Sequence, residues 1–325
     1  MRGKWFPAKE DQMEYRNLGN SGLKVSTLGL GGNTFGWYID EQTTAAVVNK
    51  ALDSGINFID TADMYDKGRS EEFVGKALKG KRTQVLVGSK FSFAMGESPN
   101  ERGASRWYIF RAVEASLKRL NTDYLDLYQY HFPDATTPIE ETLRALDDLV
   151  KSGKVRYIGC SNFAAWQISE AQWTSRVHHL HSFVTMQTKY NFLERQIEQE
   201  IVPCCKAHGL GIIPWGPLAG GFLTGKYRKS DPPPAPAKGT MPPKAYNMLY
   251  KQLITDANWE RLAKLETFAK DCGHKVNELA IAWLLSHPWV STVIVGATKP
   301  EQIQANLPGA AWKMTPEEVA RMEQI

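Results

Sequence analysis

Short apolar runs alternate along the chain with longer stretches in which apolar residues recur every three or four positions. Short runs without polar alternation are typical of strands buried on both faces, and the longer stretches are typical of amphipathic helices. The pattern predicts eight strands, at Val25–Leu30, Phe58–Ile59, Val85–Gly88, Leu125–Tyr130, Tyr157–Cys160, Phe183–Met186, Gly211–Pro214 and Thr292–Val295. The clearest predicted helices are Glu41–Ser54, Ser105–Leu120, Pro138–Lys151 and Asn258–Asp271.

Glycine follows four of the predicted helices, because it readily adopts the left-handed conformation that ends a helix. These glycines are Gly55, Gly80, Gly153 and Gly209. About eight strand–helix units in one chain predict a closed (β/α)₈ TIM barrel, with residues 1–325 forming a single domain. A doubly wound open sheet is the alternative, but it predicts G-x-G-x-x-G after the first strand, and LGLGGNTFG lacks that spacing.

Two segments lie outside the repeating pattern. Residues 15–25, YRNLGNSGLKV, have two β-prone arms around a Gly-Asn-Ser-Gly turn, which predicts an N-terminal β-hairpin that covers the bottom of the barrel. Residues 228–247 are rich in Pro and Lys and predict a long loop. Long loops in compact domains are often functional, so this one is a candidate lid over a bound cofactor.

Composition excludes several classes of protein. Charged residues make up 23% and hydrophobic residues 42% of the chain, as in ordinary globular proteins. The net charge of +4 is too small to predict binding to nucleic acid or to an anionic membrane. The most apolar stretch, Leu279–Val295, is interrupted by Ser286-His287-Pro288, so no membrane span is expected.

The chain's N-terminal residues and its four cysteines predict a cytoplasmic location. MRGKWFPAKEDQMEYR lacks the apolar core of a signal peptide. Cys160 and Cys272 are isolated and Cys204 and Cys205 are adjacent, which does not predict a disulfide scaffold.

Three short motifs suggest chemistry that their spacing does not support. GGFLTGKY, at 220–227, resembles a phosphate-binding loop, but Tyr227 replaces the Ser or Thr that would bind Mg²⁺. A glycine-rich loop with Lys226 can still approach a phosphate closely. His178, His179 and His181 match no usual zinc spacing and indicate a surface helix end, so no metal site is predicted. Gly159-Cys160-Ser161-Asn162 lacks the second glycine of a nucleophile elbow.

Polar residues of different kinds stand where predicted strands end. Asp60 ends the INFI strand and is followed by Asp63 and Tyr65, while Lys90 and His131 end two later strands. In a (β/α)₈ barrel, side chains at the carboxyl ends of strands point into the active-site mouth. We therefore expect these side chains to meet there.

Together these groups are suited to proton transfer at an oxygen atom. A buried Lys beside a Tyr is expected to lower the pKa of the phenol, and a carboxylate paired with the Lys fixes its position. The Tyr is then a candidate general acid/base, and a neutral His can orient the same oxygen. None of these groups accepts hydride, so carbonyl reduction at this site requires a cofactor.

Longer motifs resemble one known family. GINFIDTADMY followed by GRSEEFVGKAL, then SNF, PLAGGFLTGKY and a G-A-x-x-x-x-Q-x-x-x-N ending, are similar to motifs of aldo-keto reductases. The branch resembled includes bacterial general-stress reductases and potassium-channel β subunits, and the likeness extends from LGLGGNTFG to GATKPEQIQANL. It implies a (β/α)₈ barrel, NADP(H) as cofactor, and a catalytic tetrad of Asp60, Tyr65, Lys90 and His131.

The resemblance also implies how the cofactor is held, with Asp60 close to it. The ribose and nicotinamide would lie by Gly32, Asn33 and Thr34; the carboxamide by Ser161, Asn162 and Gln187; and the nicotinamide face on Trp215. The pyrophosphate would be wrapped by Gly216, Pro217, Leu218, Ala219, Gly220 and Lys226. The adenosine and its 2′-phosphate would lie by Gly296, Thr298, Lys299, Gln302 and Asn306. Better-known reductases place an Arg at the position of Gln302, which leaves Lys299 as the charge expected to favour NADPH over NADH.

The resemblance implies reversible reduction of small aldehydes or ketones to alcohols, with the proton coming from Tyr65. The alternative is a cofactor-sensing regulatory β subunit. Such subunits usually carry a long N-terminal extension, and only residues 1–14 precede the predicted hairpin here, which favours an enzyme. Aromatic residues near strand ends are candidates for an apolar substrate pocket: Trp37, Tyr38, Phe91, Phe93, Phe132 and Trp166. The sequence predicts neither the individual substrate nor the oligomeric state.

Overall fold

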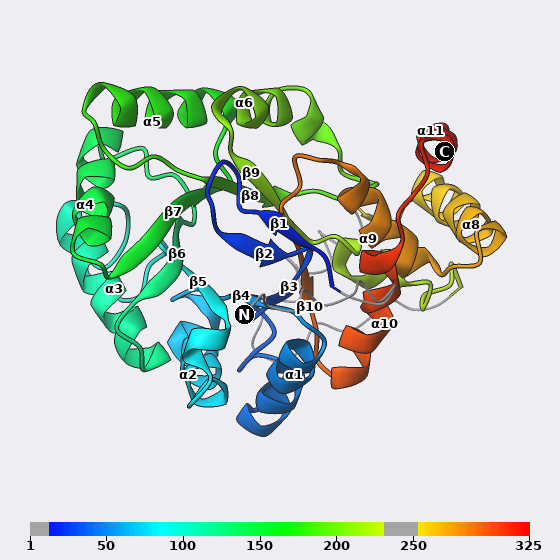
Figure 1. The fold of residues 1–325 in the computed structure, drawn as a ribbon, viewed down its shortest axis with the longest axis horizontal. Helices are drawn as coiled ribbons and strands as arrows, with labels where there is room; N and C mark the ends of the chain where they lie inside the picture. Colours follow the sequence, from blue (N-terminus) through cyan, green and yellow to red (C-terminus); the bar gives the residue numbers. More distant parts are fainter. Residues whose placement is uncertain (1–12, 231–252) are drawn as a thin grey trace, which may run out of the picture.

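The computed structural model describes residues 13–230 and 253–325, and in it the predicted barrel is confirmed (Figure 1). Eight parallel strands follow one another around the sheet, with β10 paired to β3. In this order β9 stands at the far edge of the sheet from β10. A bridge between Ile212 of β9 and Val290, just before β10, completes the ring. The strands are β3 (Leu28–Gly31), β4 (Phe58–Asp60), β5 (Leu86–Phe91), β6 (Leu125–Tyr130), β7 (Val155–Ser161), β8 (Thr185–Lys189), β9 (Gly211–Trp215) and β10 (Val293–Gly296).

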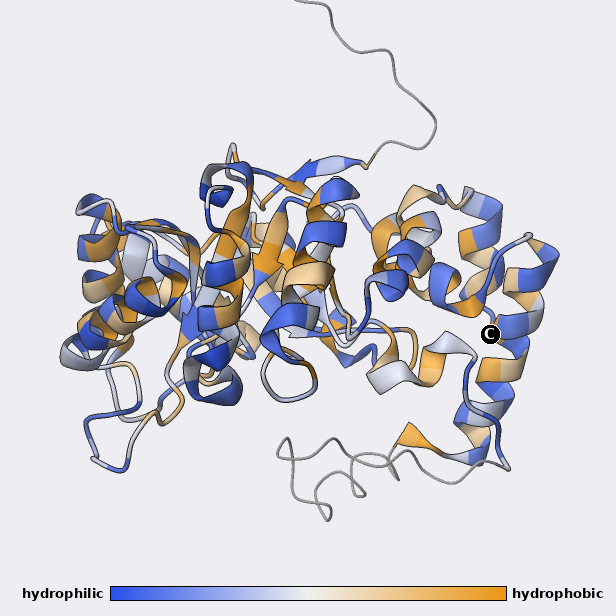
Figure 2. Cartoon of the chain, turned by 90° about the horizontal axis from the view of Figure 1, so that it is seen from below, coloured by the Kyte–Doolittle hydropathy of each residue, from blue (hydrophilic) through white to orange (hydrophobic). Residues whose placement is uncertain are grey.

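Helices surround the strands, because each strand must bury its outer face. In Figure 2 the apolar colour is concentrated on the central strands, and the helices around them carry polar residues as well. The helices are α1 (Glu41–Asp53), α2 (Arg69–Ala77), α3 (Arg106–Leu120), α4 (Ile139–Lys151), α5 (Ala165–Val177), α6 (Ile201–His208), α8 (Asp256–Asp271), α9 (Val276–Ser286), α10 (Pro300–Ala311) and α11 (Pro316–Met322). No helix in the described part of the chain is both long and apolar enough to cross a membrane.

Local sequence signals fix where the helices begin and end. The side chains of Asp40 and Ser105 accept hydrogen bonds from backbone N–H groups in the first turns of α1 and α3. The four glycines predicted to follow helices all have positive φ angles, between 72° and 82°. The four helices predicted from periodicity are all present, with ends that differ by at most two residues.

The hairpin predicted at 15–25 is present as β1 (Tyr15–Asn17) paired antiparallel with β2 (Lys24–Ser26). It lies at the amino ends of the strands, where Asn20 N–H donates to the carbonyl of Gly209. The Arg16 guanidinium ties it to the end of α9, donating at 2.8 Å to the carbonyl of Leu285. Leu18 and Val25 pack against four inward-facing barrel residues and close the bottom of the barrel: Phe58, Leu127, Ile213 and Ile294.

Seven of the eight predicted strands begin or end at a different residue in the structure, and two of these differences concern how the chain enters the barrel. Val25–Leu30 is not one strand, because the chain leaves the hairpin at Ser26 and enters the barrel at Leu28. The Ser26 hydroxyl donates to the carbonyl of Leu28 at 2.6 Å, which stabilises this corner. Phe183 lies before β8 rather than within it, although its side chain is buried in the core. Most of the predicted lid, from residue 231 onward, lies outside the described residues.

Candidate active site

Strand pairing brings the predicted polar residues to one rim of the barrel. Asp60 ends β4 in register with Gly88, and Lys90 stands two residues further along β5, in register with Gln129 of β6. Ser161 ends β7 in register with Gln187 of β8. Parallel strands place their carboxyl ends together, so side chains from five neighbouring strands converge at this rim.

Lys90 is the centre of the cluster. Its Nζ lies 2.6 Å from Oδ2 of Asp60, and the two side chains are 0% and 3% exposed. The same Nζ donates to the carbonyl of Thr61 at 2.9 Å and to the hydroxyl of Tyr65 at 3.3 Å. All three donors of the ammonium group therefore have oxygen partners, which offsets the cost of burying the charge.

The second oxygen of Asp60 is held by two amides. Nε2 of Gln129 and Nε2 of Gln187 each donate to Oδ1 at 2.9 Å. Gln129 was not predicted from the sequence, although it stands two residues before His131 and so shares its face of the strand. Gln187 was expected to contact the cofactor carboxamide. In the structure its amide, like that of Gln129, donates to the Asp60 carboxylate.

Tyr65 reaches Lys90 from a tight turn after β4. The 3₁₀ segment η1 (Tyr65–Gly68) contains two residues in the left-handed region, Asp66 at φ 46° and Lys67 at φ 54°. Non-glycine residues adopt that region at a cost, and the ion pair between Asp66 and Arg69 at 2.9 Å helps to hold it. The turn leaves the Tyr65 ring between Trp37 and the edge of His131, with ring centres 6.2 Å and 5.8 Å away.

Burial determines the direction of the Tyr65 pKa. Removal from water raises it above the usual value of 10.0, Lys90 acts to lower it, and Asp60 acts to raise it. The expectation that Lys90 gives a lowered pKa is therefore wrong for this structure, because desolvation outweighs the ammonium charge. Burial also acts to lower the pKa of Lys90, but Asp60 and Tyr65 outweigh it and the net direction is upward. At neutral pH the site holds a protonated phenol beside an ammonium ion.

His131 is neutral at neutral pH. Burial, followed by the nearby charge of Lys90, holds its pKa well below the usual 6.5. Its backbone N–H donates to the carbonyl of Phe91 at 3.0 Å, which fixes it at the rim just after β6. Its Nδ1 is buried without a hydrogen-bond partner among the described residues. The ring therefore has an imidazole nitrogen that is not committed to the surrounding protein.

Asp63 lies beneath this cluster rather than in it. Its side chain is buried, and neither carboxyl oxygen has a side-chain or backbone partner among the residues described. Burial, then the charge of Glu71, raises its pKa well above the usual value. Among the described residues, the carboxyl makes no hydrogen bond to a member of the tetrad.

The residues expected at the nicotinamide adjoin the tetrad. Asn162, at φ 60°, uses Nδ2 to donate at 3.0 Å both to the carbonyl of His131 and to Oγ of Ser161. Nε1 of Trp215 donates to Oδ1 of Asn162 at 3.4 Å. Trp215 is 36% exposed, so it lies at the mouth and does not fill the barrel core. An aromatic face is thus available beside the predicted carboxamide site.

A glycine-rich turn follows β9 where the pyrophosphate is expected. Gly216 has φ 68°, and the 3₁₀ segment η4 (Ala219–Thr224) contains positive φ at Ala219, Gly220 and Gly221. Lys226 folds back over this turn, since a Cβ at Gly221 would lie 3.2 Å from its Nζ. Backbone and ammonium are brought together there, as close approach to a phosphate requires. Pro217 and Leu218 complete the turn between Gly216 and η4.

The residues expected at the adenosine lie at the start of α10. Oε1 of Gln302 accepts from the backbone N–H groups of Thr298 at 2.6 Å and Lys299 at 3.2 Å, so Gln302 caps the helix. Asn306 is buried, and its Oδ1 accepts from Nδ2 of Asn277 at 3.2 Å. Both side chains therefore already have structural partners. The Thr298 hydroxyl also donates to Oε1 of Gln302, at 3.2 Å, which leaves Lys299 as the freer side chain of this set among the described residues.

The first βα loop joins these regions. Gly32 N–H donates to the carbonyl of Asp60 at 2.7 Å, and Thr34 Oγ1 donates to the carbonyl of Ala297 at 2.9 Å. A Cβ at Gly296 would lie 3.4 Å from Oδ1 of Asn33, which places Asn33 beside β10. The predicted cofactor residues thus form a continuous band from the tetrad to α10.

The aromatic residues predicted for the pocket divide into two groups. Phe93 packs edge-on against His131 at 4.7 Å and lies 6.1 Å from Phe132, which is half exposed. With Trp37 beside Tyr65, these rings lie around the Tyr65 and His131 side chains. Phe91 does not belong with them, because it is fully buried and stacks on Tyr130 at 5.2 Å. Tyr38 and Trp166 are exposed, and no ring contact joins either to the tetrad within the described part of the chain.

The three neighbouring histidines, which were not interpreted as a metal site from the sequence, lie at a helix end as predicted. His178 caps α5, and His178, His179 and His181 are all exposed. Nδ1 of His181 lies 2.7 Å from Oδ1 of Asp147. Among residues 13–230 and 253–325, no group of three or more His, Cys, Asp or Glu side chains could hold a metal ion.

A parallel eight-stranded barrel with a Lys, an Asp, a Tyr and a His at its carboxyl rim defines the class of protein. The sequence model of the aldo/keto reductase family matches residues 27–325, and the chain belongs to this family. The family resemblance predicted from the motifs is thereby confirmed.

Individual relatives fit the predicted branch. The chain is 39% identical over 320 residues to a probable voltage-gated potassium channel subunit beta of Oryza sativa subsp. japonica, and the match covers 96% of each chain. It is 39% identical over 303 residues to the uncharacterized oxidoreductase YrpG of Bacillus subtilis (strain 168), covering 90% of this chain and 89% of YrpG. It is 36% identical over 313 residues to the aldo-keto reductase YhdN of the same bacterium, covering 94% and 91%.

Proposed function

We propose that this protein is an NADP(H)-dependent oxidoreductase that reversibly converts small aldehydes or ketones into alcohols. The observation that carries the proposal is the protonated Tyr65 hydroxyl held at 3.3 Å by the buried Lys90, with neutral His131 beside it. This is the arrangement of a proton donor that faces a substrate oxygen. Relatives named as an oxidoreductase and as an aldo-keto reductase support it.

The residues present fit a nicotinamide dinucleotide phosphate. The glycine turn at Gly216–Gly221 and the overlying Lys226 suit the pyrophosphate, and Trp215 beside Asn162 suits the nicotinamide ring. Lys299 at the start of α10 is placed to favour a 2′-phosphate, as a point charge. When bound, the cofactor supplies or accepts the hydride.

Each residue of the tetrad has a separate role in the transfer of one proton. Tyr65 gives its proton to the carbonyl oxygen of the substrate as the alcohol forms, and recovers a proton in the reverse reaction. Lys90 stabilises the negative charge that develops on the Tyr65 oxygen, since the ammonium acts in a buried site of low dielectric constant. Asp60 holds Lys90 in place, and neutral His131 can hydrogen-bond the same substrate oxygen and orient it.

Aromatic side chains around the tetrad favour carbonyl compounds with an apolar group. Trp37, Phe93 and Phe132 surround Tyr65 and His131, while the charges of Asp60 and Lys90 lie beneath them. Such a mouth excludes water from the reacting oxygen better than a polar one. We infer that aromatic or bulky aldehydes are better substrates than small hydrophilic ones.

A regulatory subunit that senses the cofactor is the second candidate, because similar proteins carry the name of potassium-channel β subunits. Such a protein would retain the same tetrad. The length of an N-terminal extension does not separate the two functions, since the chain covers 96% of the rice protein. Turnover separates them: an enzyme consumes cofactor repeatedly, whereas a sensor oxidises what it holds and then stops.

A steady-state screen tests the proposal directly. NADPH and NADH are each supplied with a panel of aromatic, aliphatic and sugar-derived carbonyl compounds, and cofactor absorbance at 340 nm is followed. We expect many turnovers per protein molecule with at least one aromatic aldehyde and NADPH. A single turnover with every compound would favour the sensor, and no oxidation of either cofactor would contradict both functions.

A further inference from the structure

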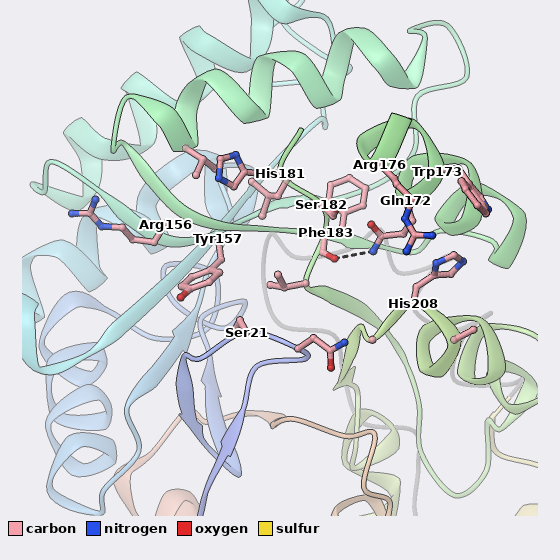
Figure 3. A pocket seen from close by; sticks show the side chains of 16 residues that line it. Ser21, Arg156, Tyr157, Gln172, Trp173, Arg176, His181, Ser182, Phe183 and His208 are labelled. Atoms are coloured by element: carbon pink, nitrogen blue, oxygen red, sulfur yellow. Dashed lines mark hydrogen bonds between the residues drawn. The ribbon is translucent and has the colours of Figure 1, made fainter. Parts of the chain in front are cut away.

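An open pocket of about 650 Å³ lies at the amino ends of the strands, away from the tetrad (Figure 3). Asn20 and Ser21 of the hairpin turn form one side of it, and Arg156 and Tyr157 at the start of β7 form another. The remaining walls come from α5, the segment 181–184 before β8, and the end of α6. Because the tetrad stands at the carboxyl ends of the same strands, the pocket is on the opposite face of the barrel.

The lining of this pocket is basic. Arg156, Arg176, His181 and His208 contribute to it, and none of its 16 lining residues is Asp or Glu. His181 is paired with Asp147, 2.7 Å away. The two arginines have no ion-pair partner within the described parts of the chain; each guanidinium instead lies over an aromatic ring. Two positive charges without carboxylate partners favour an anionic ligand.

Arg176 is held by its neighbours on α5. Its guanidinium lies 5.1 Å from the ring centre of Trp173, and the nearby Gln172 is fixed by a hydrogen bond from its Nε2 to the carbonyl of Phe183 at 2.8 Å. In Figure 3 Gln172, Arg176 and His208 stand toward one end of the pocket, and Arg156 and Tyr157 toward the other. One end of the pocket is therefore arranged to receive an acidic group.

Apolar and aromatic side chains line the space between the charged ends. Tyr157 presents ring surface and Val184 adds aliphatic surface, whereas Phe183 and Ile158 adjoin the space but are almost wholly buried. Trp173 is more than half exposed although it is large and apolar. Exposed aromatic surface beside cationic groups suits a ligand with both a ring and an acid.

We propose that this pocket is a second binding site, for a small planar aromatic acid such as a carboxylate or sulfonate. The acid group binds between Arg176 and His208, where the guanidinium can donate two parallel hydrogen bonds. The ring packs against the exposed Trp173, which stands at the same end of the pocket as Arg176 in Figure 3. The volume lies in the range of sites that hold one small ligand of this kind. This site is independent of the proposed catalytic function, since it shares no residue with the tetrad or the cofactor band.

The experiment is a fluorescence titration with two matched probes. 1-Anilinonaphthalene-8-sulfonate carries a sulfonate, and N-phenyl-1-naphthylamine has the same rings without it. We expect saturable binding of the sulfonate by the wild-type protein, and binding weakened about tenfold or more in the double variant Arg176→Gln/His208→Gln, since both groups proposed to hold the sulfonate are lost. The uncharged probe should bind weakly and with the same affinity to both proteins.

Arg111→Gln is the matched control. Arg111 is also exposed, and its guanidinium lies 4.6 Å from the ring centre of Trp107, so this change removes a similar stacked arginine from another helix. It should leave sulfonate binding unchanged, and Arg176→Lys should retain part of it. Equal sulfonate affinity in the wild-type protein and the double variant overturns the proposal, as does an equal loss in Arg111→Gln or the absence of saturable binding. Thermal unfolding of each variant verifies that all are folded.

Discussion

The ammonium group of Lys90 and the carboxylate of Asp60 are 2.6 Å apart in a place that solvent barely reaches. The pair extends into a network, because Gln129 and Gln187 bind the other carboxylate oxygen and Tyr65 binds the ammonium. A buried pair of this kind is stable only when all its hydrogen bonds are made. The two charges proposed to act in the chemistry are therefore energetically coupled, and removing either one alone should destabilise the barrel rim.

Lys90→Met should lower the free energy of unfolding by about 3–5 kcal/mol, because it leaves the Asp60 carboxylate buried without its counter-charge. Asp60→Asn/Lys90→Met should be less destabilised than the sum of the two single changes, since neither charge is then left alone. Urea unfolding of the three variants measures this. Additive losses would contradict energetic coupling of the two side chains.

Tyr65→Phe should abolish most carbonyl reduction while the protein still binds NADPH. The change removes one oxygen, and loss of a general acid typically costs about 10²–10⁴-fold in rate. Steady-state rates and NADPH titration measure the two properties separately. A variant that keeps more than about a tenth of the wild-type kcat would show that Tyr65 is not the proton donor.

The pH dependence of reduction follows from two pKa directions. The raised pKa of Tyr65 keeps the phenol protonated at neutral pH, so activity should fall only as pH rises through a value above 10.0. The lowered pKa of His131 keeps the imidazole neutral until the pH is well below 6.5. We expect kcat/KM for reduction to be constant from about pH 7 to about pH 9. A profile that falls between pH 7 and 9 would be at odds with a protonated Tyr65 donor.

Lys299→Ala should weaken NADPH binding far more than NADH binding. A charge-assisted phosphate contact contributes roughly 1.5–3 kcal/mol, which corresponds to about 10–100-fold in affinity. Gln302 caps α10 here and is not an arginine, so no second charge of α10 is expected to compensate. Dissociation constants for both cofactors measure the effect. Equal losses for NADPH and NADH would show that Lys299 does not contact the 2′-phosphate.

Trp215→Tyr should retain most NADPH affinity but lose part of the Trp fluorescence quench that NADPH causes. The indole lies at the mouth and bonds to Asn162, in position to stack on the nicotinamide. Its partial exposure means that Trp215→Ala should cost less stability than the roughly 3–5 kcal/mol of a buried Trp. NADPH titrations of both variants and the wild type measure this. If NADPH quenched Trp fluorescence equally in Trp215→Tyr and the wild type, and Trp215→Ala bound NADPH with full affinity, Trp215 would have only a packing role.

Much of the fold could be predicted from local pattern. Helix periodicity, capping residues and the glycines after helices depend on neighbours in the sequence, and the helices they predict are present. The split between β2 and β3 was missed because no local signal in Val25 to Leu30 separates two strands, and the corner at Ser26 depends on a hydrogen bond to Leu28. The meeting of Asp60, Lys90 and His131 at one rim also followed from sequence, since strand ends in a barrel lie together.

The sequence by itself determined which side chains could reach the rim: Asp60, Lys90 and His131 stand at or beside strand ends, and Tyr65 lies in the turn that follows β4. Only the tertiary structure decided their ionisation, because desolvation depends on everything packed around a group and here it outweighs Lys90 at Tyr65. It also decided that Gln129 holds Asp60, that Gln302 caps a helix, and that Arg156 and Arg176 share one pocket. These relationships join residues far apart in the chain, and no local pattern specifies such distances.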